Sequence, residues 1–377
     1  MKKVLVPKVR FKGFDNNWEQ GNIGEVFELT RGEVLSQRKI RNKKMGEYIY
    51  PVFSSQTLNN GLLGFYNNFL FKNSITWTTD GANAGTVLYR DGLFYATNVC
   101  GVMLQKTSIK PSSYFAHEIN VKVKKHVIKA GNPKLMINVL HEVLINFSKN
   151  KLEQEKISIL IENIDNLITL EQTKLNKLKQ LKETLLQKMF PEHNSKTPRI
   201  RFKGFNEEWK EEKLEYIAKV TNGKSNTSDN NKWGQYNLYI RSEEIYKSNK
   251  YIFDVEGVIT VGDGNIGKIF HYVNGKFDLH QRCYLIYEFQ NIWPKYFYYY
   301  FSQNFYKRAI LMSYTATVNS IRMNTITDMD IMFPKELIEQ QKIGNFFSKI
   351  DNLISLYQSK LKKLKKIKEA LLQKMFV

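Results

Sequence analysis

Two segments of the chain, residues 152–190 and 338–376, place apolar side chains at steps of three and four residues. This spacing predicts two long amphipathic helices of the coiled-coil type. At roughly 1.5 Å per residue, each helix would be about 58 Å long. The apolar positions of the first segment are Ile157, Leu160, Ile164, Leu167, Leu175, Leu178, Leu181 and Leu185.

Two related apolar stripes in one chain favour an intramolecular, antiparallel coiled coil, because each helix meets the other at a high effective concentration. Packing of each helix on its own domain or on another subunit is the alternative. Glu171 and Tyr357 occupy the same slot in the two segments, which indicates imperfect symmetry or a contact with something else. The residues expected in the helix pair are Ile157, Ile164, Leu167, Leu178, Leu185, Ile343, Ile350, Leu353, Leu364 and Leu371.

Outside these segments, short runs of β-branched and aromatic residues end at Gly-Asn and Asp-Gly pairs, which predicts strands joined by tight turns. Residues 292–312, rich in tyrosine and phenylalanine, predict a helix that docks on such a sheet. The expected class is therefore α+β, with strand-rich mixed domains. The runs expected as strands are YPVFSS (50–55), GTVLYR (85–90), GVMLQ (101–105), GKIFHYV (267–273) and RCYLIYEF (282–289).

The chain is an internal repeat. Residues 198–223 repeat residues 7–32 with nine of 26 positions identical, and residues 338–376 repeat residues 152–190 with 24 of 39 identical. Antiparallel packing of the two repeated helices would relate the copies by an internal pseudo-two-fold axis. The expected organisation is a first domain at 1–150, a helix at 151–190, a linker at 191–198, a second domain at 199–337 and a helix at 338–377.

Between the repeated ends the two copies diverge. Asp80-Gly81 and Gly85 still resemble Asp263-Gly264 and Gly267, and Cys100 falls opposite Cys283. A duplicated frame with divergent centres is expected of two reading domains that share a fold but not a surface.

The net charge of +21, from 57 Lys+Arg against 36 Asp+Glu, favours a polyanionic partner, although an AT-rich genome would also raise the lysine count. Two cysteines allow neither a disulfide framework nor a zinc cluster. The apolar run near the start is too short for a signal peptide, and no uncharged apolar stretch of about 18 residues exists. A soluble, cytoplasmic protein without a membrane partner is expected.

Motifs of catalysis are incomplete. Residues 262–268 match GxxxxGK, but Ile269 stands where a phosphate-binding loop needs Ser or Thr, so a hairpin turn is expected there. Asn132-Pro133 lacks the second proline and the aromatic residue of an amino-methyltransferase loop. The six histidines form no metal-ligand spacing. No catalytic residues and no metal site are therefore expected.

The arrangement resembles the specificity subunit of Type I restriction-modification systems, over essentially the whole chain. The residues that carry the likeness occur in pairs: Arg10–Trp18 with Arg201–Trp209, Glu153–Ile157 with Glu339–Ile343, Ile164–Ile168 with Ile350–Ile354, and Leu185–Phe190 with Leu371–Phe376.

The resemblance implies a non-catalytic subunit with two target recognition domains, each reading one half of a split double-stranded DNA sequence. The paired helices would act as the spacer between the half-sites. The implied partners are two methyltransferase subunits, which would hold S-adenosylmethionine and methylate adenine, and restriction subunits in the full complex. No cofactor is expected in this chain.

Base reading needs polar side chains on loops that face the groove of DNA. The candidates were selected by side-chain type beside turns, or where the copies diverge. Arg10 and Arg201, shared by both copies, favour a structural role. The DNA-binding candidates are Arg31, Ser54, Ser55, Gln56, Asn83 and Asn98 in the first domain, and Lys224, Arg241, Asn265, Lys268, Gln281, Arg282, Asn319 and Arg322 in the second.

Three other functions stay open on the sequence alone. The chain could be a stand-alone architectural DNA-binding protein, a structural coiled-coil adaptor, or a nucleotide-driven enzyme that uses residues 262–268. Sequence-specific footprints, co-purification of a methyltransferase, and nucleotide binding that is lost in Lys268→Ala distinguish these possibilities.

Overall fold

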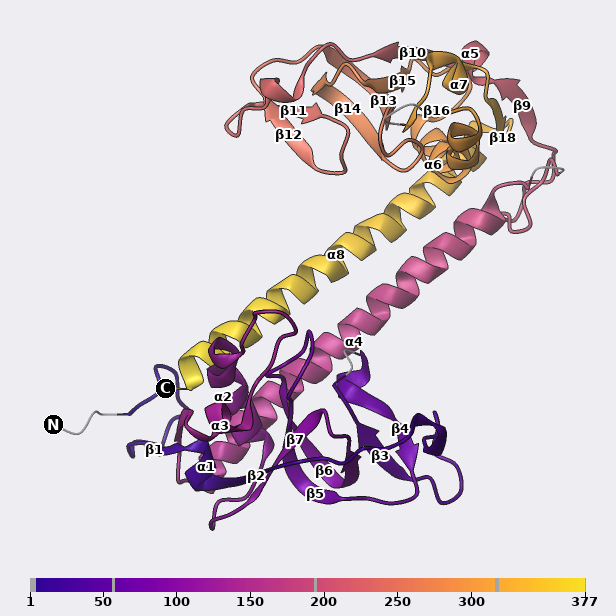
Figure 1. Ribbon diagram of the computed structural model, residues 1–377. Helices are drawn as coiled ribbons and strands as arrows, with labels where there is room; N and C mark the ends of the chain where they lie inside the picture. The colour runs from indigo at the N-terminus through magenta and orange to yellow at the C-terminus, as the bar shows by residue number, and fades with distance from the viewer. Residues whose placement is uncertain (1–4, 56–57, 193–194, 316–318, 377) are drawn as a thin grey trace. The chain divides into compact units, whose positions relative to one another are not determined.

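A computed structural model of the chain describes residues 5–55, 58–192, 195–315 and 319–376 (Figure 1). The chain forms two compact units. The first comprises Met1–Glu171 and Lys360–Val377, and the second comprises Gln172–Ser359. Each unit therefore contains one domain and a part of each long helix.

The first unit is built on a mixed six-stranded sheet in the order β2-β7-β5-β6-β3-β4. Neighbouring strands are antiparallel except β3 and β6, which are parallel. A separate antiparallel pair joins β1 and β8. The bounds are β1 (Glu19–Asn22), β2 (Phe27–Arg31), β3 (Tyr50–Phe53), β4 (Leu62–Tyr66), β5 (Phe71–Thr78), β6 (Val87–Ala96), β7 (Cys100–Gln105) and β8 (Leu144–Phe147).

The second unit repeats this topology, in the order β10-β15-β13-β14-β11-β12 with β11 and β14 parallel. Two further antiparallel pairs join β9 with β18 and β16 with β17. The bounds are β9 (Lys210–Lys213), β10 (Lys219–Asn222), β11 (Tyr236–Tyr239), β12 (Ile245–Ser248), β13 (Phe253–Val261), β14 (Phe270–Leu279), β15 (Cys283–Tyr287), β16 (Tyr314–Thr315), β17 (Asn319–Ser320) and β18 (Asp330–Phe333).

Helices complete both units, and the predicted α+β class with two mixed, strand-rich domains is confirmed. The α-helices are α1 (Ile23–Val26), α2 (Ser113–Val123), α3 (Ile137–His141), α4 (Lys151–Met189), α5 (Leu214–Ile217), α6 (Pro294–Leu311), α7 (Met323–Thr327) and α8 (Leu337–Met375). Short 3-10 turns lie at η1 (Gln37–Lys39), η2 (Leu58–Gly61), η3 (Lys124–His126) and η4 (Thr227–Asp229).

One face of each sheet is covered by a helix. In the second unit, Tyr296, Phe297, Phe301 and Phe305 of α6 are buried in one cluster with Val258 of β13. This is the aromatic helix that the sequence predicts, and its Tyr296, Tyr299 and Tyr300 are buried, whereas Tyr306 is exposed. In the first unit α2 takes the same place. Cys100 and Cys283, which fall opposite each other in the repeat, begin β7 and β15 and are both buried and free.

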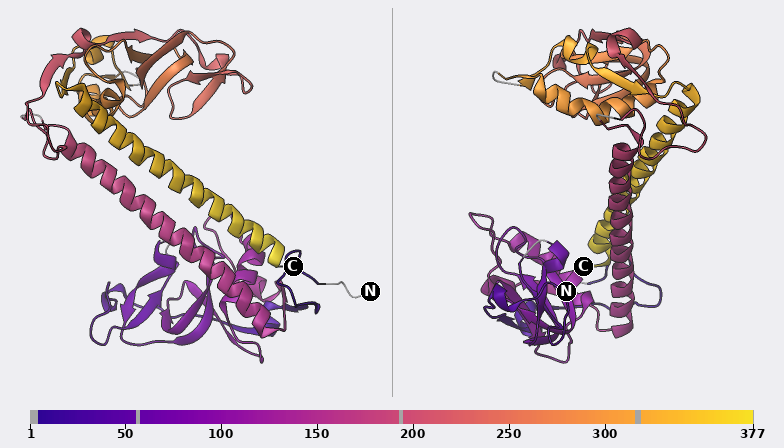
Figure 2. Two further views of the ribbon diagram at one scale, coloured as in Figure 1. Left: turned by 180° about the vertical axis from the view of Figure 1, so that it is seen from behind. Right: turned by 90° about the vertical axis from the view of Figure 1, so that its right-hand side faces the viewer.

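The long helices α4 and α8 run antiparallel (Figure 2). Within the first unit, Lys368 contacts Asp165 at 2.5 Å and Lys360 contacts Glu171 at 3.0 Å, so numbers rise along α4 as they fall along α8. Within the second unit, Lys182 contacts Asp351 at 2.5 Å. These residues are repeat partners, because Asp165 corresponds to Asp351 and Lys182 to Lys368. The predicted intramolecular helix pair is confirmed.

The end of each long helix packs on a repeated tryptophan. In the first unit, Trp18 lies edge-on to Phe376 with ring centroids 6.2 Å apart. In the second unit, Trp209 lies edge-on to Phe190 at 6.4 Å. Each domain is therefore closed by the end of the helix that belongs to the other copy of the repeat.

Most of the residues expected in the helix pair are buried or half-buried. Ile157 and Leu371 join the core of the first unit, and Leu178, Leu185, Ile343 and Ile350 join that of the second. Ile164 is buried and Leu364 half-buried.

Leu167 and Leu353 were wrongly placed in the pair, because they are 47% and 45% exposed. A helix turns about 100° per residue, so Glu171 lies only about 20° from the direction of Ile164, whereas Leu167 lies about 60° away. Glu171 is buried and paired with Lys360, so it continues the seam in place of Leu167.

Glu118 on α2 provides a test of the first unit's core. Its carboxylate is buried, accepts the backbone N–H of Asn146 at 3.0 Å and lies 3.8 Å from the Lys122 ammonium. Desolvation is the main reason that its pKa rises to about 7. Because the folded pKa lies above the ordinary value, the protonated carboxyl stabilises the unit at low pH, and this stability is lost as pH rises through about 7.

We expect Glu118→Gln to raise the free energy of unfolding at pH 8 by roughly 1–3 kcal/mol, since the amide keeps an acceptor oxygen without the charge. Chemical denaturation at pH 8 and pH 5 measures this, with exposed Glu142→Gln as the control. The gain should be much smaller at pH 5, which lies just above the ordinary pKa of a glutamate, and an equal gain at both pH values would contradict the explanation.

Candidate nucleic-acid interface

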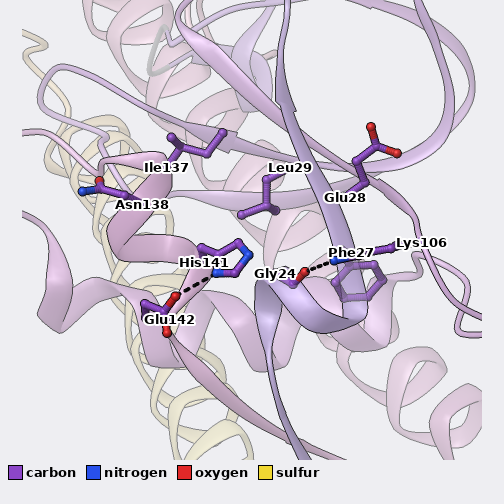
Figure 3. Close-up of a pocket in the computed structure, with 9 residues that line it drawn as sticks. All are labelled: Gly24, Phe27, Glu28, Leu29, Lys106, Ile137, Asn138, His141 and Glu142. Carbon is purple, nitrogen blue, oxygen red and sulfur yellow. Dashed lines mark hydrogen bonds and ion pairs between the residues drawn. The ribbon is translucent and has the colours of Figure 1, made fainter.

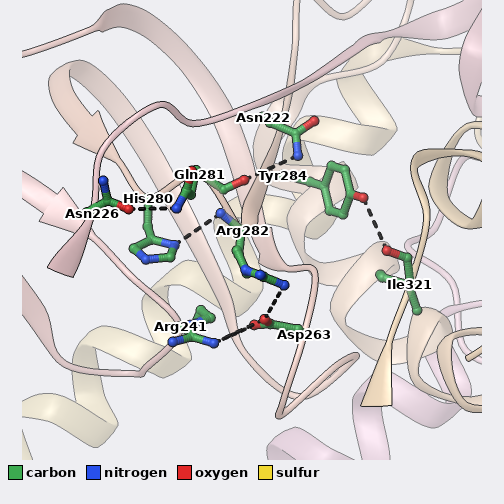
Figure 4. Close-up of polar contacts among 9 residues, drawn as sticks. All are labelled: Asn222, Asn226, Arg241, Asp263, His280, Gln281, Arg282, Tyr284 and Ile321. Atoms are coloured by element: carbon green, nitrogen blue, oxygen red, sulfur yellow. Dashed lines mark hydrogen bonds and ion pairs between the residues drawn. The ribbon is translucent and has the colours of Figure 1, made fainter. Parts of the chain in front are cut away.

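Arg241, Asp263 and Arg282 form an ion cluster at one end of the second sheet (Figure 4). Asp263 lies in the turn between β13 and β14, Arg241 follows β11, and Arg282 precedes β15. The Arg241 Nη1 donates to both Asp263 oxygens at 3.1 and 3.0 Å, and the Arg282 Nη1 donates to Oδ2 at 3.3 Å. One carboxylate thus holds two guanidinium groups that come from different loops.

The three side chains of this cluster differ in how far they are exposed to solvent. The Asp263 side chain is 8% exposed, whereas Arg241 is 44% and Arg282 62% exposed. Each guanidinium uses only Nη1 toward Asp263 and has Nε and Nη2 left as donors. The buried Asp263 carboxylate therefore holds two guanidinium groups that are exposed to solvent.

The turn that carries Arg282 is fixed by further polar contacts (Figure 4). The Gln281 amide donates to Asn226 Oδ1 at 2.6 Å, and the Asn222 amide donates to the Gln281 carbonyl at 3.4 Å. The Arg282 N–H donates to His280 Nδ1 at 3.0 Å. Desolvation, with a contribution from Arg241, lowers the pKa of His280, which keeps the ring neutral and Nδ1 free to accept.

The first unit has the same backbone frame around Asp80. The Thr79 N–H donates to the Val99 carbonyl at 3.1 Å, and the Gly262 N–H donates to the Arg282 carbonyl at 2.8 Å. The Gly81 N–H donates to Pro133 and the Gly264 N–H to Asn319, both at 2.9 Å. The Thr97 and His280 backbone N–H groups likewise donate to the carbonyls of the last residues of β3 and β11. These matched bonds define which positions of the two domains are equivalent.

The side chains at the equivalent positions differ. Ser55 and Val99 of the first domain occupy the positions of Arg241 and Arg282 in the second. Each residue of a pair stands at the same number of residues from a strand end that is equivalent in the two domains. Asn98 replaces Gln281 and Lys134 replaces Ser320. Asp80 is retained, but its partners are the Thr79 hydroxyl at 2.6 Å and Lys134 at 3.8 Å. One frame therefore displays two different chemistries.

The first-domain candidates lie around this Asp80 end. Arg31 ends β2 and is exposed, and Ser54 and Ser55 follow β3. The Asn83 amide donates to the Ser55 carbonyl at 3.5 Å. Asn98 is exposed in the loop before β7. Gln56 lies outside the described residues.

The second-domain candidates divide into two groups. The structure brings Arg241, Gln281, Arg282 and Asn319 together around the Asp263 turn. The others are exposed outside this ion cluster: Lys224 follows β10, Asn265 and Lys268 lie further along the same β13–β14 turn, and Arg322 precedes α7. The Lys268 ammonium lies 5.6 Å from the Tyr306 ring centroid. Base contact by any of these residues stays a prediction.

Sequence reasoning missed Asp263, Asn226 and His280, which position the candidates. The repeated Asp-Gly at residues 80–81 and 263–264 was visible, but it was interpreted as a turn only. Aspartate was not among the side-chain types considered for base reading. The signal that could have found it is the survival of Asp between centres that otherwise diverge.

Three other arginines are structural. Arg90 lies 3.7 Å over the Phe53 ring, donates to the Thr76 hydroxyl and the Asn60 carbonyl, and has its pKa lowered to about 10 by burial. Arg10 and Arg201 make two-pronged ion pairs with Glu153 and Glu339, which agrees with the shared structural role expected for them.

An open groove beside α1 and α3 contains no candidate residue (Figure 3). The Lys106 ammonium donates to the Gly24 carbonyl at 2.7 Å, and His141 contacts Glu142 at 2.9 Å. Its lining consists of Gly24, Phe27, Glu28, Leu29, Lys106, Ile137, Asn138, His141 and Glu142. None of these residues belongs to the cluster around Asp263.

Residues 262–268 join the antiparallel strands β13 and β14, as the predicted hairpin turn requires. Among the described residues, no group of three or more His, Cys, Asp or Glu side chains could hold a metal ion. Within the same part of the chain, no helix is long and apolar enough to cross a membrane.

The family described as the Type I restriction modification DNA specificity domain matches the chain twice, at residues 15–180 and 206–366. The chain belongs to this family. Both matches include one sheet and part of the long helix that follows it, so the repeat seen in the sequence is a repeat of this domain. The predicted Type I specificity subunit with two target recognition domains is confirmed.

A Mycoplasma pneumoniae protein named type I specificity subunit S.MpnORF289P N-terminus is 39% identical over 142 residues, which are 37% of this chain and 74% of that protein. Two other specificity subunits of that organism, 32% and 35% identical over 52% and 38% of this chain, are matched over 51% and 47% of their own length. The chain thus spans about half the length of these two relatives.

Solved structures share the fold. The S subunit of a Type-I restriction-modification system from M. genitalium has a TM-score of 0.73 at 18% identity, over 99% of both chains. A chain from a structure of complex assembly and conformational transition of the type I R-M system has a TM-score of 0.54 at 15% identity, over 97% of this chain and 99% of that chain.

Proposed function

We propose that this specificity subunit reads a bipartite double-stranded DNA site, one half-site per domain, and performs no chemical step itself. The observation that carries the proposal is the pair of equivalent sheet ends around Asp80 and Asp263, which keep one backbone frame and differ in side chains. A protein that reads two different half-sites needs two domains with the same backbone frame and different side chains. The charge of +21 supports attraction to the phosphates of DNA.

In this proposal, two methyltransferase subunits dock on the subunit and hold S-adenosylmethionine for methylation of adenine, and restriction subunits complete the full complex. The support is an exposed apolar stripe that both long helices repeat. Leu152 and Leu170 of α4 are 170 − 152 = 18 residues apart, about five helical turns, and so point the same way. Ile338 and Leu356 repeat them on α8, and all four are exposed.

Each unit carries one full set of this apolar stripe. The recurrence of exposed apolar side chains on one face of both helices supports an interaction surface there. Two equal sets in one chain fit two copies of one partner. We define the docking stripe as Leu152, Leu167, Leu170 and Ile367 in the first unit, and Ile338, Leu353, Leu356 and Leu181 in the second.

Genome-wide adenine methylation in cells with and without the chain tests the function, with the partner methyltransferase present in both. A split, asymmetric methylated motif that disappears with the chain is the expected result. An unchanged methylome, with the methyltransferase shown to be active, would contradict the proposal and favour an architectural or adaptor role.

Exchange of the second domain, residues 199–337, for that of another family member tests the assignment of half-sites. We expect one half of the methylated motif to be replaced completely and the other half to stay unchanged, because the first sheet end is untouched. Sequencing of the methylated motif measures this. The reciprocal exchange of residues 1–150 is the control and should replace the other half. A chimaera with both halves changed would rule out one domain per half-site.

A further inference from the structure

We infer that the second domain demands a guanine in its half-site, read by the guanidinium pair that Asp263 positions, and that the first domain makes no such demand at the equivalent place. This inference rests on the proposed DNA-reading function and names the base that the site selects. It assigns Asp263, which makes no DNA contact itself, as the positioning residue.

Guanine offers two acceptors in the major groove, N7 and O6, and an arginine fork is the side chain that meets both at once. Such reading needs a guanidinium with two adjacent N–H donors directed to solvent. Arg241 and Arg282 meet this requirement, because each uses only Nη1 on the carboxylate and is about half exposed or more. Adenine, which pairs one acceptor with one donor, cannot accept both N–H groups.

The Asp263 carboxylate reduces the conformational entropy that the two arginine side chains lose when they bind DNA. A free arginine loses up to about 2 kcal/mol of rotamer freedom when it is held in one geometry. Asp263 restrains both side chains in the free protein, and the carboxylate is itself fixed by the turn, where the Gly264 N–H bonds to Asn319. Its oxygens already accept three hydrogen bonds from the arginines, and the side chain is nearly buried (Figure 4). It is therefore poorly placed to accept from a cytosine amino group.

The matched positions of the first domain lack this chemistry. Val99 has no donor where Arg282 stands, and Ser55 offers one hydroxyl where Arg241 stands. Asp80 instead accepts from the Thr79 hydroxyl. Its charged partner Lys134, 3.8 Å away, carries a compact ammonium and not the planar fork of adjacent N–H donors that an arginine offers. Selection of guanine at this place should thus be confined to the second domain.

The experiment uses the full chain with its methyltransferase partner and sequences the methylated motif of each variant. The half-site that changes on exchange of residues 199–337 is the one assigned to the second domain. In the wild-type motif that half-site must contain a G·C pair. Arg241→Ala and Arg282→Ala are the test variants, and Arg199→Ala is the matched control, an exposed arginine paired with Glu192 in the linker.

We expect at least one test variant to reduce the preference for guanine at one position of that half-site by about 10- to 100-fold. The first half-site should stay unchanged, and Arg199→Ala should leave the whole motif unchanged. If the arginines contact only phosphates, both variants would instead weaken methylation of every site alike and flatten its salt dependence. That result would overturn the inference.

Asp263→Asn distinguishes positioning from a structural role, because it keeps the shape of the side chain but removes the charge. We expect relaxed selection at the same single position, without a matching change at others. A merely structural residue would lower methylation of all sites in proportion to lost stability. A wild-type half-site without guanine would refute the inference and leave the DNA-reading function standing, whereas a chain without any effect on the methylome would refute both.

Discussion

Replacing Arg10 with alanine is expected to lower the free energy of unfolding of the first unit by about 3–5 kcal/mol. The Arg10 Nε and Nη2 donate to the two Glu153 oxygens at 2.6 and 2.9 Å. The Glu153 side chain is 0% exposed and that of Arg10 10%. Removal of the guanidinium therefore leaves a buried carboxylate without its counter-charge, which costs far more than the loss of a surface ion pair.

The second unit carries the same pair and should respond alike. Arg201 donates to the two Glu339 oxygens at 2.7 and 2.8 Å, and Glu339 is 1% exposed. The hydrogen bond to the glutamate is the main cause of the raised pKa of each arginine. Because both pairs fix the start of a long helix to the repeated motif of its own domain, loss of either should loosen one unit only.

Chemical denaturation of Arg10→Ala and Arg201→Ala measures the effect, with Arg199→Ala as the exposed control. Arg199 also pairs with a glutamate, but both partners are mostly exposed, so its loss should cost under about 1 kcal/mol. Addition of Glu153→Gln to Arg10→Ala should restore part of the stability, since the uncompensated charge is gone. A cost in Arg10→Ala as small as that of the control would contradict this account.

Charge placed on the docking stripe should separate the subunit from its partner without unfolding it. We expect Leu170→Glu and Leu356→Glu each to weaken methyltransferase binding at one of the two sites by about 30-fold or more, because a carboxylate must then be buried in an apolar contact. Both leucines are exposed in the isolated chain, so its stability should change little.

Titration of the methyltransferase subunit against the full chain, with the number of bound subunits counted, measures this effect. The double variant should lose both sites. Leu311→Glu, at an exposed leucine at the end of α6, is the matched control and should bind two subunits as the wild type does. Unchanged affinity in both stripe variants would show that the partner docks elsewhere.

Local pattern predicts the elements of this protein well. The expected helical segments 152–190 and 338–376 correspond within one residue to α4 and α8. The aromatic run at 292–312 forms α6, and residues 262–268 form a hairpin turn. These features follow from periodicity and turn chemistry over a few neighbouring residues, which do not depend on what packs against them.

The choice between two apolar faces of one helix lies beyond local pattern. Leu167 and Leu353 fit the steps of three and four, yet they are exposed, and buried Glu171 occupies the seam in the first unit. A charged side chain is tolerated there because Lys360 on the facing helix neutralises it. The spacing of apolar residues along the sequence carries no information about the Lys360 contact, so it placed Leu167 in the helix pair in error.

The sequence by itself determined the duplication, the two long helices, the aromatic helix, the five expected strand runs and the family, because these rest on repeated motifs and local periodicity. Only the tertiary structure decided that Phe376 closes the first domain on Trp18 and Phe190 the second on Trp209. It also gathered Arg241, Asp263 and Arg282 from three loops. Such contacts join residues far apart in the chain, and packing and charge pairing in three dimensions select them.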